Sequence, residues 1–157
     1  MSQNLTGRFS GTFYGTVTDH RIVIPKTFVN ELKFYGDIKR IVITRGDKEC
    51  LLLFPESVYN KYCDILEVGN SKDQQKLAAW EHFSSGIKIL EANGRVRLSQ
   101  KILESTSIHK DIKFVGQKDH ITIWSKEVSD KLEQELLDFL SNSNMESSIR
   151  IWYIINQ

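Results

Sequence analysis

The 157-residue sequence is poor in the features that mark disulfide-rich, zinc-binding and membrane proteins. It has two cysteines, Cys50 and Cys63, without CxxC spacing or a nearby histidine cluster. We therefore expect two free thiols, with no disulfide framework and no metal site. No run approaches the roughly 18–20 apolar residues that a membrane span needs, and the first residues hold no apolar signal-peptide core. These absences predict a cytoplasmic protein without a membrane partner.

Motifs for catalysis and cofactor binding are missing as well. The sequence contains no GxSxG nucleophile motif, no glycine-rich phosphate loop and no HExxH metal site. Its four histidines are scattered along the chain. We expect no enzyme activity, no cofactor and no small-molecule substrate.

The formal net charge is only +1, which argues against a uniformly basic nucleic-acid-binding surface. The charges are unevenly distributed, however. Residues 1–45 contain seven basic and three acidic residues, whereas residues 126–146 contain two basic and six acidic residues. The first part of the chain is therefore the part suited to an anionic partner.

A gapless internal repeat relates residues 21–39 to residues 95–113, at an offset of 74. Apolar positions keep their register, and both segments end in Asp-Ile-Lys. A repeat at a fixed offset indicates one supersecondary unit used twice. Periodicity predicts two strands around a tight turn, a short helix, two more strands and a closing helix in each unit. The strands are expected at 12–17, 22–24, 40–44 and 50–54, and again at 87–90, 96–98, 113–116 and 121–124, with short helices at 26–32 and 100–104.

These patterns predict an α+β fold in which two β-α-β repeats fuse into one compact domain, with a C-terminal helix. The expected parts are a first repeat at 9–66, an inter-repeat helix at 71–86, a second repeat at 87–140 and a C-terminal extension at 141–157. Ser71 and Gln74 form a candidate capping box at the start of the inter-repeat helix. In the extension, residues 149–155 are apolar on both faces, which predicts an extra strand in need of a partner.

Four short sequence motifs lie in a specific order along these turns and strands. They are Thr18–Pro25 (TDHRIVIP), Cys50–Val58 (CLLLFPESV), Glu91–Ser99 (EANGRVRLS) and Ile121–Glu127 (ITIWSKE). With their spacing, they resemble the MraZ family within the AbrB-like swapped-hairpin group, over about residues 9–135. The chain departs from the family pattern in several ways. The first turn is one residue shorter and lacks the family's Lys-Gly pair, Glu91 replaces an aspartate, and Ser99 replaces a proline. The extension after about residue 141 also lies outside the family pattern.

The resemblance implies tandem swapped-hairpin repeats in a cytoplasmic, nucleoid-associated transcriptional regulator. Members of the family form ring oligomers and bind direct repeats of double-stranded DNA, upstream of the division and cell-wall gene cluster. The turn arginines, Arg21 and Arg95, are carried over as the principal DNA contacts, because a guanidinium makes bidentate contacts to phosphate and to guanine. The full set of expected DNA-binding residues is Arg21, Arg95, Arg97, Lys26, His20 and Asn93.

A degenerate family member that acts as an assembly or protein-binding scaffold is the alternative. The shortened first turn, the low net charge and the apolar segment 149–155 favour it. Salt dependence separates the two hypotheses, because counterion release makes DNA binding weaken steeply as salt rises. An AbrB-like antitoxin fits less well, since antitoxins of this type typically have one short hairpin domain instead of two repeats.

Overall fold

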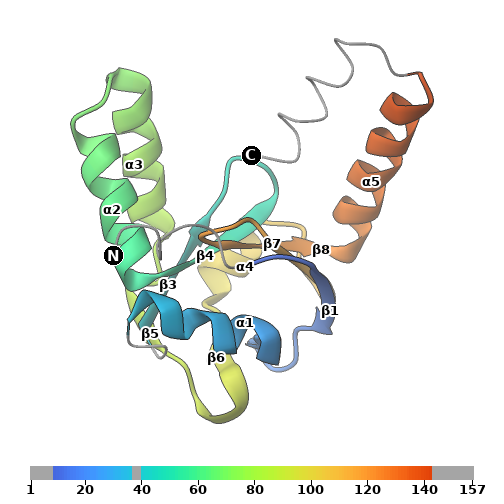
Figure 1. The fold of residues 1–157 in the computed structure, drawn as a ribbon, viewed down its shortest axis with the longest axis horizontal. Helices are drawn as coiled ribbons and strands as arrows, with labels where there is room; N and C mark the ends of the chain where they lie inside the picture. The colour runs from blue at the N-terminus through green and yellow to red at the C-terminus, as the bar shows by residue number, and fades with distance from the viewer. Residues whose placement is uncertain (1–8, 37–39, 143–157) are drawn as a thin grey trace.

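The computed structural model describes residues 9–36 and 40–142, and it contains a large and a small antiparallel sheet (Figure 1). The strand order in the large sheet is β1-β7-β8-β4-β3-β5. Its strands are β1 (Thr12–Thr16), β3 (Arg40–Arg45), β4 (Cys50–Pro55), β5 (Ile87–Ile89), β7 (Asp111–Gly116) and β8 (Ile121–Ser125). The small sheet pairs β2 (Arg21–Val23) with β6 (Arg95–Arg97). The predicted α+β class is confirmed.

The two halves of the chain exchange strands within the large sheet. β1 from the first half pairs with β7 from the second, and β5 from the second half pairs with β3 from the first. β4 and β8 pair at the centre, where both strands are buried along their whole length. Continuous apolar runs such as LLLF at 51–54 are typical of strands covered on both faces. The halves therefore share one sheet.

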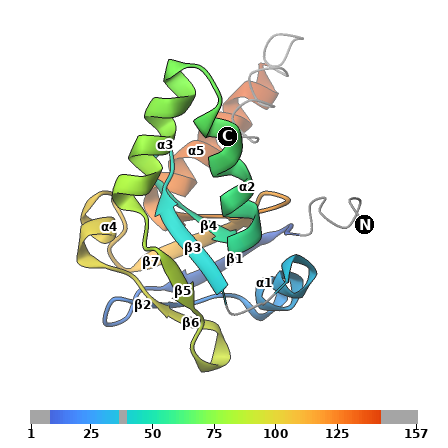
Figure 2. The same ribbon diagram turned by 90° about the vertical axis from the view of Figure 1, so that its left-hand side faces the viewer.

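Helices lie on both sides of this sheet (Figure 1). The hairpin of α2 and α3 rises from one part of a face and α5 from another, while α1 and the turn before β6 lie on the opposite side. Figure 2 shows α2 and α3 packed side by side. The helical elements are α1 (Lys26–Glu31), η2 (Leu32–Tyr35), α2 (Glu56–Glu67), α3 (Ser71–Phe83), η3 (Ala92–Gly94), α4 (Gln100–Glu104) and α5 (Lys126–Ser141). None of the helices in the described ranges is long and apolar enough to cross a membrane.

Aromatic rings anchor α1 and η2 to the start of the chain. The ring of Phe28 in α1 contacts Phe9 edge-on at 5.7 Å between centroids and Phe13 at 5.0 Å. Tyr35 in η2 stacks on Phe9 at 5.5 Å. Buried aromatic pairs of this kind add to the burial of apolar area. They fix the position of α1, and with it the position of Lys26 at its first turn.

The prediction for the inter-repeat helix is wrong in two details. Its N-cap is Asn70, one residue earlier than the predicted Ser71: the Asn70 side chain accepts from the Asp73 N–H at 2.9 Å, and the Asp73 carboxylate accepts from the Asn70 N–H at 3.3 Å. The helix ends at Phe83, three residues before Gly86, because Ser84 is already extended with ψ of 138°. The predicted strand at 149–155 lies outside the described residues.

Candidate nucleic-acid interface

The small sheet sorts its side chains onto two faces. Ile22 pairs with Val96 in the register, and both are buried, with exposed fractions of 0% and 1%. Because successive side chains of a strand point to opposite faces, the flanking residues turn outward. Arg21 faces Arg97 across the ladder, and Val23 faces Arg95. Three arginines and one valine therefore form an outward surface, which we call the arginine face (Arg21, Val23, Arg95 and Arg97).

A two-residue turn leads into β2. The N–H of Thr18 donates to the carbonyl of Arg21 at 2.9 Å, and the N–H of Arg21 donates back at 3.0 Å. The two residues between them, Asp19 and His20, have φ of 54° and 61°. This is the type I′ geometry, which matches the twist of a hairpin; Asp and His are among the non-glycine residues that tolerate it. The turn presents the exposed His20 side chain at its tip.

The second turn, before β6, is longer and depends on glycine. Asn93 and Gly94 have φ of 67° and 79°. A Cβ added at Gly94 would lie 3.1 Å from the carbonyl oxygen of Ile24. That close approach allows the Ile24 N–H to donate to the Gly94 carbonyl at 2.9 Å, and the Leu98 N–H makes the matching bond to the His20 carbonyl at 2.7 Å. Each turn is thereby bonded to the chain that follows the other turn.

We expect Gly94→Ala to lower the free energy of unfolding by about 1–3 kcal/mol, because alanine is strained at positive φ and its Cβ crowds Ile24. Urea denaturation followed by circular dichroism measures the change. Asn93→Gly is the matched control, since glycine adopts the neighbouring positive φ without strain, and its effect should stay within about 0.5 kcal/mol. Equal stability of Gly94→Ala and wild type would contradict the tight contact between the turn and Ile24.

The three arginines differ in their electrostatic surroundings. Arg21 has two acidic neighbours, Asp19 at 3.7 Å and Glu91 at 3.5 Å, and its side chain is 34% exposed. Arg95 and Arg97 are exposed, and no hydrogen bond or ion pair holds either side chain within the described part of the chain. Their guanidinium groups are therefore free to meet an anion.

The register sets Arg21 and Arg97 directly opposite each other. Cross-strand neighbours lie about 4.5–5.5 Å apart at Cβ, and like charges there destabilise a sheet. Glu91 and Asp19 relieve this repulsion in part through Arg21. A phosphate group between or beside the arginines would relieve it further, because each guanidinium can bind phosphate in a bidentate manner.

The remaining predicted residues lie around the ribbon of β2 and β6. Lys26 and Asn93 line one depression of about 590 Å³ between α1 and the second turn. His20 belongs to the first turn, so it is not a member of that pair. The structure thus brings Arg21, Arg95 and Arg97 together on one face and places Lys26 with Asn93 beside the second turn.

Two contributors to this surface were not predicted from the sequence. Val23 is 51% exposed and sits among the arginines, where an apolar group suits contact with a thymine methyl. Glu91 was considered only as a turn residue, yet its carboxylate faces Arg21 of the other hairpin. The alternation of β2 could have indicated Val23, but no local signal indicates the ion pair. Within residues 9–36 and 40–142, no cluster of three His, Cys, Asp or Glu side chains could hold a metal ion.

Comparison with known proteins identifies relatives over most of the chain, although no protein-family model matches it. The chain is 31% identical over 125 residues to the transcriptional regulator MraZ of Bacteroides fragilis, an alignment that covers 73% of this chain and 75% of the relative. It is 33% identical over 112 residues to the MraZ of Clostridium acetobutylicum, covering 70% and 75%. A match to the MraZ of Dictyoglomus turgidum, at 24% identity over 153 residues, covers 92% and 98%.

These relatives come from several bacterial groups, and each alignment covers at least 70% of this chain. The chain belongs to the MraZ family.

Proposed function

We propose that this protein is a DNA-binding transcriptional regulator that reads double-stranded DNA with the arginine face. The observation that carries the proposal is the register of β2 and β6, which sets Arg21, Arg95 and Arg97 on one exposed surface over a buried Ile22–Val96 pair. The major groove of B-DNA admits a two-stranded β-ribbon. Its proposed activity is binding, with no chemical step.

The contacts divide into two kinds. Arg95 and Arg97, which are free of acidic partners in the described residues, are the proposed base-reading groups, since arginine recognises guanine O6 and N7. Lys26, Asn93 and His20 lie beside them and are proposed to contact phosphate and sugar, which position the protein without specifying sequence. Arg21 is proposed to contribute less than its neighbours because Asp19 and Glu91 already compensate its charge.

The family supplies finer expectations for the assembly. We infer two swapped-hairpin repeats at 9–66 and 87–140, joined by the helix at 71–86 and followed by the extension at 141–157. The exchange of β1 and β5 between the halves supports this division. A ring of subunits on direct DNA repeats, upstream of the division and cell-wall genes, would compensate for a net charge of only +1 per chain, because linked binding sites gain effective concentration. The nucleoid in the cytoplasm is the expected location.

A protein-binding scaffold is the second candidate. The two carboxylates beside Arg21 favour it, because they lower the positive potential of the arginine face. Two observations distinguish a scaffold from a DNA-binding regulator. A scaffold forms its oligomer with or without DNA, and it does not bind one duplex more tightly than another.

The test is fluorescence anisotropy with a duplex from the gene's own upstream region and with a shuffled duplex, each at two salt concentrations. We expect the native duplex to bind more tightly by at least about 10³-fold, and its affinity to fall steeply between 50 and 200 mM salt. Size-exclusion chromatography with light scattering reports the oligomer in parallel. Equal, weak binding of both duplexes by an intact oligomer would favour the scaffold.

A further inference from the structure

A cavity of about 370 Å³ lies between the large sheet and the α2–α3 hairpin. That hairpin and β6, which carries two residues of the arginine face, lie on opposite sides of the large sheet (Figure 1). The walls of the cavity come from β4, β8, α2, α3 and the turns between β3 and β4 and between β7 and β8. Small-molecule sites typically have volumes of about 300–1,000 Å³ and are lined by apolar and aromatic groups with a few polar ones. The volume of this cavity lies within that range.

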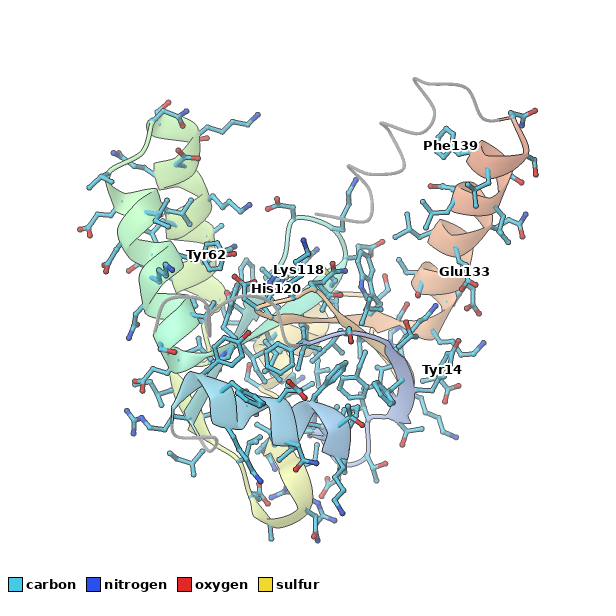
Figure 3. All side chains as sticks on the ribbon, viewed as in Figure 1. Tyr14, Tyr62, Lys118, His120, Glu133 and Phe139 are labelled. Carbon is cyan, nitrogen blue, oxygen red and sulfur yellow. The ribbon has the colours of Figure 1, made fainter. Side chains whose placement is uncertain are left out.

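Aromatic rings form one continuous wall of the cavity. Phe54 at the centre contacts Trp80 at 5.2 Å, Tyr62 at 5.7 Å and His120 at 5.1 Å between ring centroids. Trp124 lines the same space. Figure 3 shows Tyr62 on the helical side and His120 on the sheet side of this region. Such a wall favours a flat ring, which can stack or meet these rings edge-on.

The polar groups of the wall are held by one another. The Tyr62 hydroxyl donates to Asp119 at 2.7 Å, and His120 Nδ1 lies 2.9 Å from the other oxygen of that carboxylate. Burial raises the pKa of the Cys50 thiol to about 12, so this lining residue is neutral at physiological pH. Among the described residues, Trp80 Nε1 is a buried donor without a hydrogen-bond partner. The wall is therefore mainly aromatic, and its one carboxylate, Asp119, is held by Tyr62 and His120.

Cationic groups and a rigid turn form the rim. Lys76 of α3 lies 3.3 Å from Asp47 of the β3–β4 turn, while the neighbouring Lys48 has no acidic partner in the described chain. Arg45 donates to the backbone carbonyls of Gly46 and Lys48, which braces this turn. A Cβ added at Gly46 would lie 2.6 Å from the Cys50 sulfur, so a larger residue there would have to displace that side chain. The rim thus offers an ammonium group on a turn whose backbone is held by Arg45.

We propose that this cavity binds a small aromatic anion, with a flat ring against the Phe54–Trp80 wall and the anionic group at Lys48. Binding would brace the α2–α3 hairpin against the β3–β4 turn, because residues of both elements line the cavity. This inference is independent of the proposed DNA recognition, which uses the small sheet of β2 and β6.

The probe is 1-anilinonaphthalene-8-sulfonate, tested beside N-phenyl-1-naphthylamine, which has the same rings without the charge. We expect saturable fluorescence from one sulfonate probe per chain of the full-length folded protein, and a shift of the Trp80 indole N–H resonance during the titration. That resonance is assigned by its loss in Trp80→Phe. Lys48→Glu should lower the affinity for the sulfonate probe about ten-fold, because the sulfonate then meets a negative charge. The affinity for the uncharged probe should change by less than about two-fold.

Ile65→Trp places a larger side chain in the lining of the cavity and should lower the affinity for both probes at least about ten-fold. Val68→Trp, at the C-cap of the same helix but outside the cavity and 85% exposed, is the matched control and should change neither affinity. The proposal is overturned if the folded protein binds no probe saturably, or if Ile65→Trp and Val68→Trp bind both probes as the wild type does.

Discussion

The double variant Arg95→Ala, Arg97→Ala is expected to lose about 10²- to 10⁴-fold in affinity for the native upstream duplex. Each side chain is exposed, free of acidic partners in the described residues and presented by β6. A lost bidentate base contact costs about 1–3 kcal/mol, and two such losses multiply in the binding constant. Fluorescence anisotropy at fixed salt measures the change, and thermal unfolding confirms that the fold is intact.

Charge and recognition can be separated by two further variants. Lys72→Ala, Lys131→Ala removes the same net charge from exposed positions on α3 and α5, and it should change affinity less than about three-fold. Arg95→Lys, Arg97→Lys retains the charge without the planar fork, so it should keep binding to the shuffled duplex and lose preference for the native one. If the lysine-to-alanine control loses as much affinity as the arginine variant, the interface lies elsewhere.

Phe114→Ala is expected to lower the free energy of unfolding by about 3–5 kcal/mol, a large share of the 5–15 kcal/mol typical of a domain. Phe114 is 1% exposed on β7, where its neighbours in the register are Phe13 of β1 and Ile123 of β8. Its ring also covers Gly15, whose Cβ, if present, would lie 3.0 Å from it. The truncation therefore leaves a cavity at the seam between the two halves.

Urea denaturation measures this loss through the transition midpoint. Ile87→Ala on the edge strand β5 is the control, because Ile87 is 49% exposed and its truncation should cost less than about 1 kcal/mol. A Phe114→Ala midpoint within error of the control would show that the seam between β1 and β7 is not well packed.

Short-range patterns of the sequence predicted much of the fold. Ile22, Ile24, Val96 and Leu98 alternate in sequence and are all buried, because a strand with one covered face has a period of two. The short helix at 100–104 has the predicted bounds, since Ser99 caps it through the Ile102 N–H at 3.2 Å.

The cap of α3 shows where local patterns become ambiguous. Asn70 with Asp73 and Ser71 with Gln74 are overlapping candidates at the same spacing. Asn70 is the residue that adopts the extended conformation of an N-cap, with ψ of −179°, and it follows directly on the loop after α2. The residue at which α3 begins depends on how α2 and α3 pack against each other. Neither capping pattern contains information about that packing.

The arginine face was only partly accessible to sequence reasoning. Strand alternation predicts that each arginine points away from the face that buries its neighbour in the sequence. It does not predict the pairing of β2 with β6, which joins segments 74 positions apart. The same pairing brings Glu91 beside Arg21. Strand partners are chosen by the global arrangement of the chain, so this balance of charge required the structure.

The exchange of strands between the halves also sets when the protein can fold. Thr12 of β1 pairs with Val115 of β7, so the contact that completes one edge of the sheet closes a very long loop. Pairings this distant in sequence place folding toward the slow end of the millisecond-to-second range. During synthesis at about 5–20 residues per second, β1 waits roughly 5–20 s for its partner to leave the ribosome. A chain released before β7 has no partner for β1, so premature termination yields a product exposed to proteolysis and aggregation instead of a half-sized working domain.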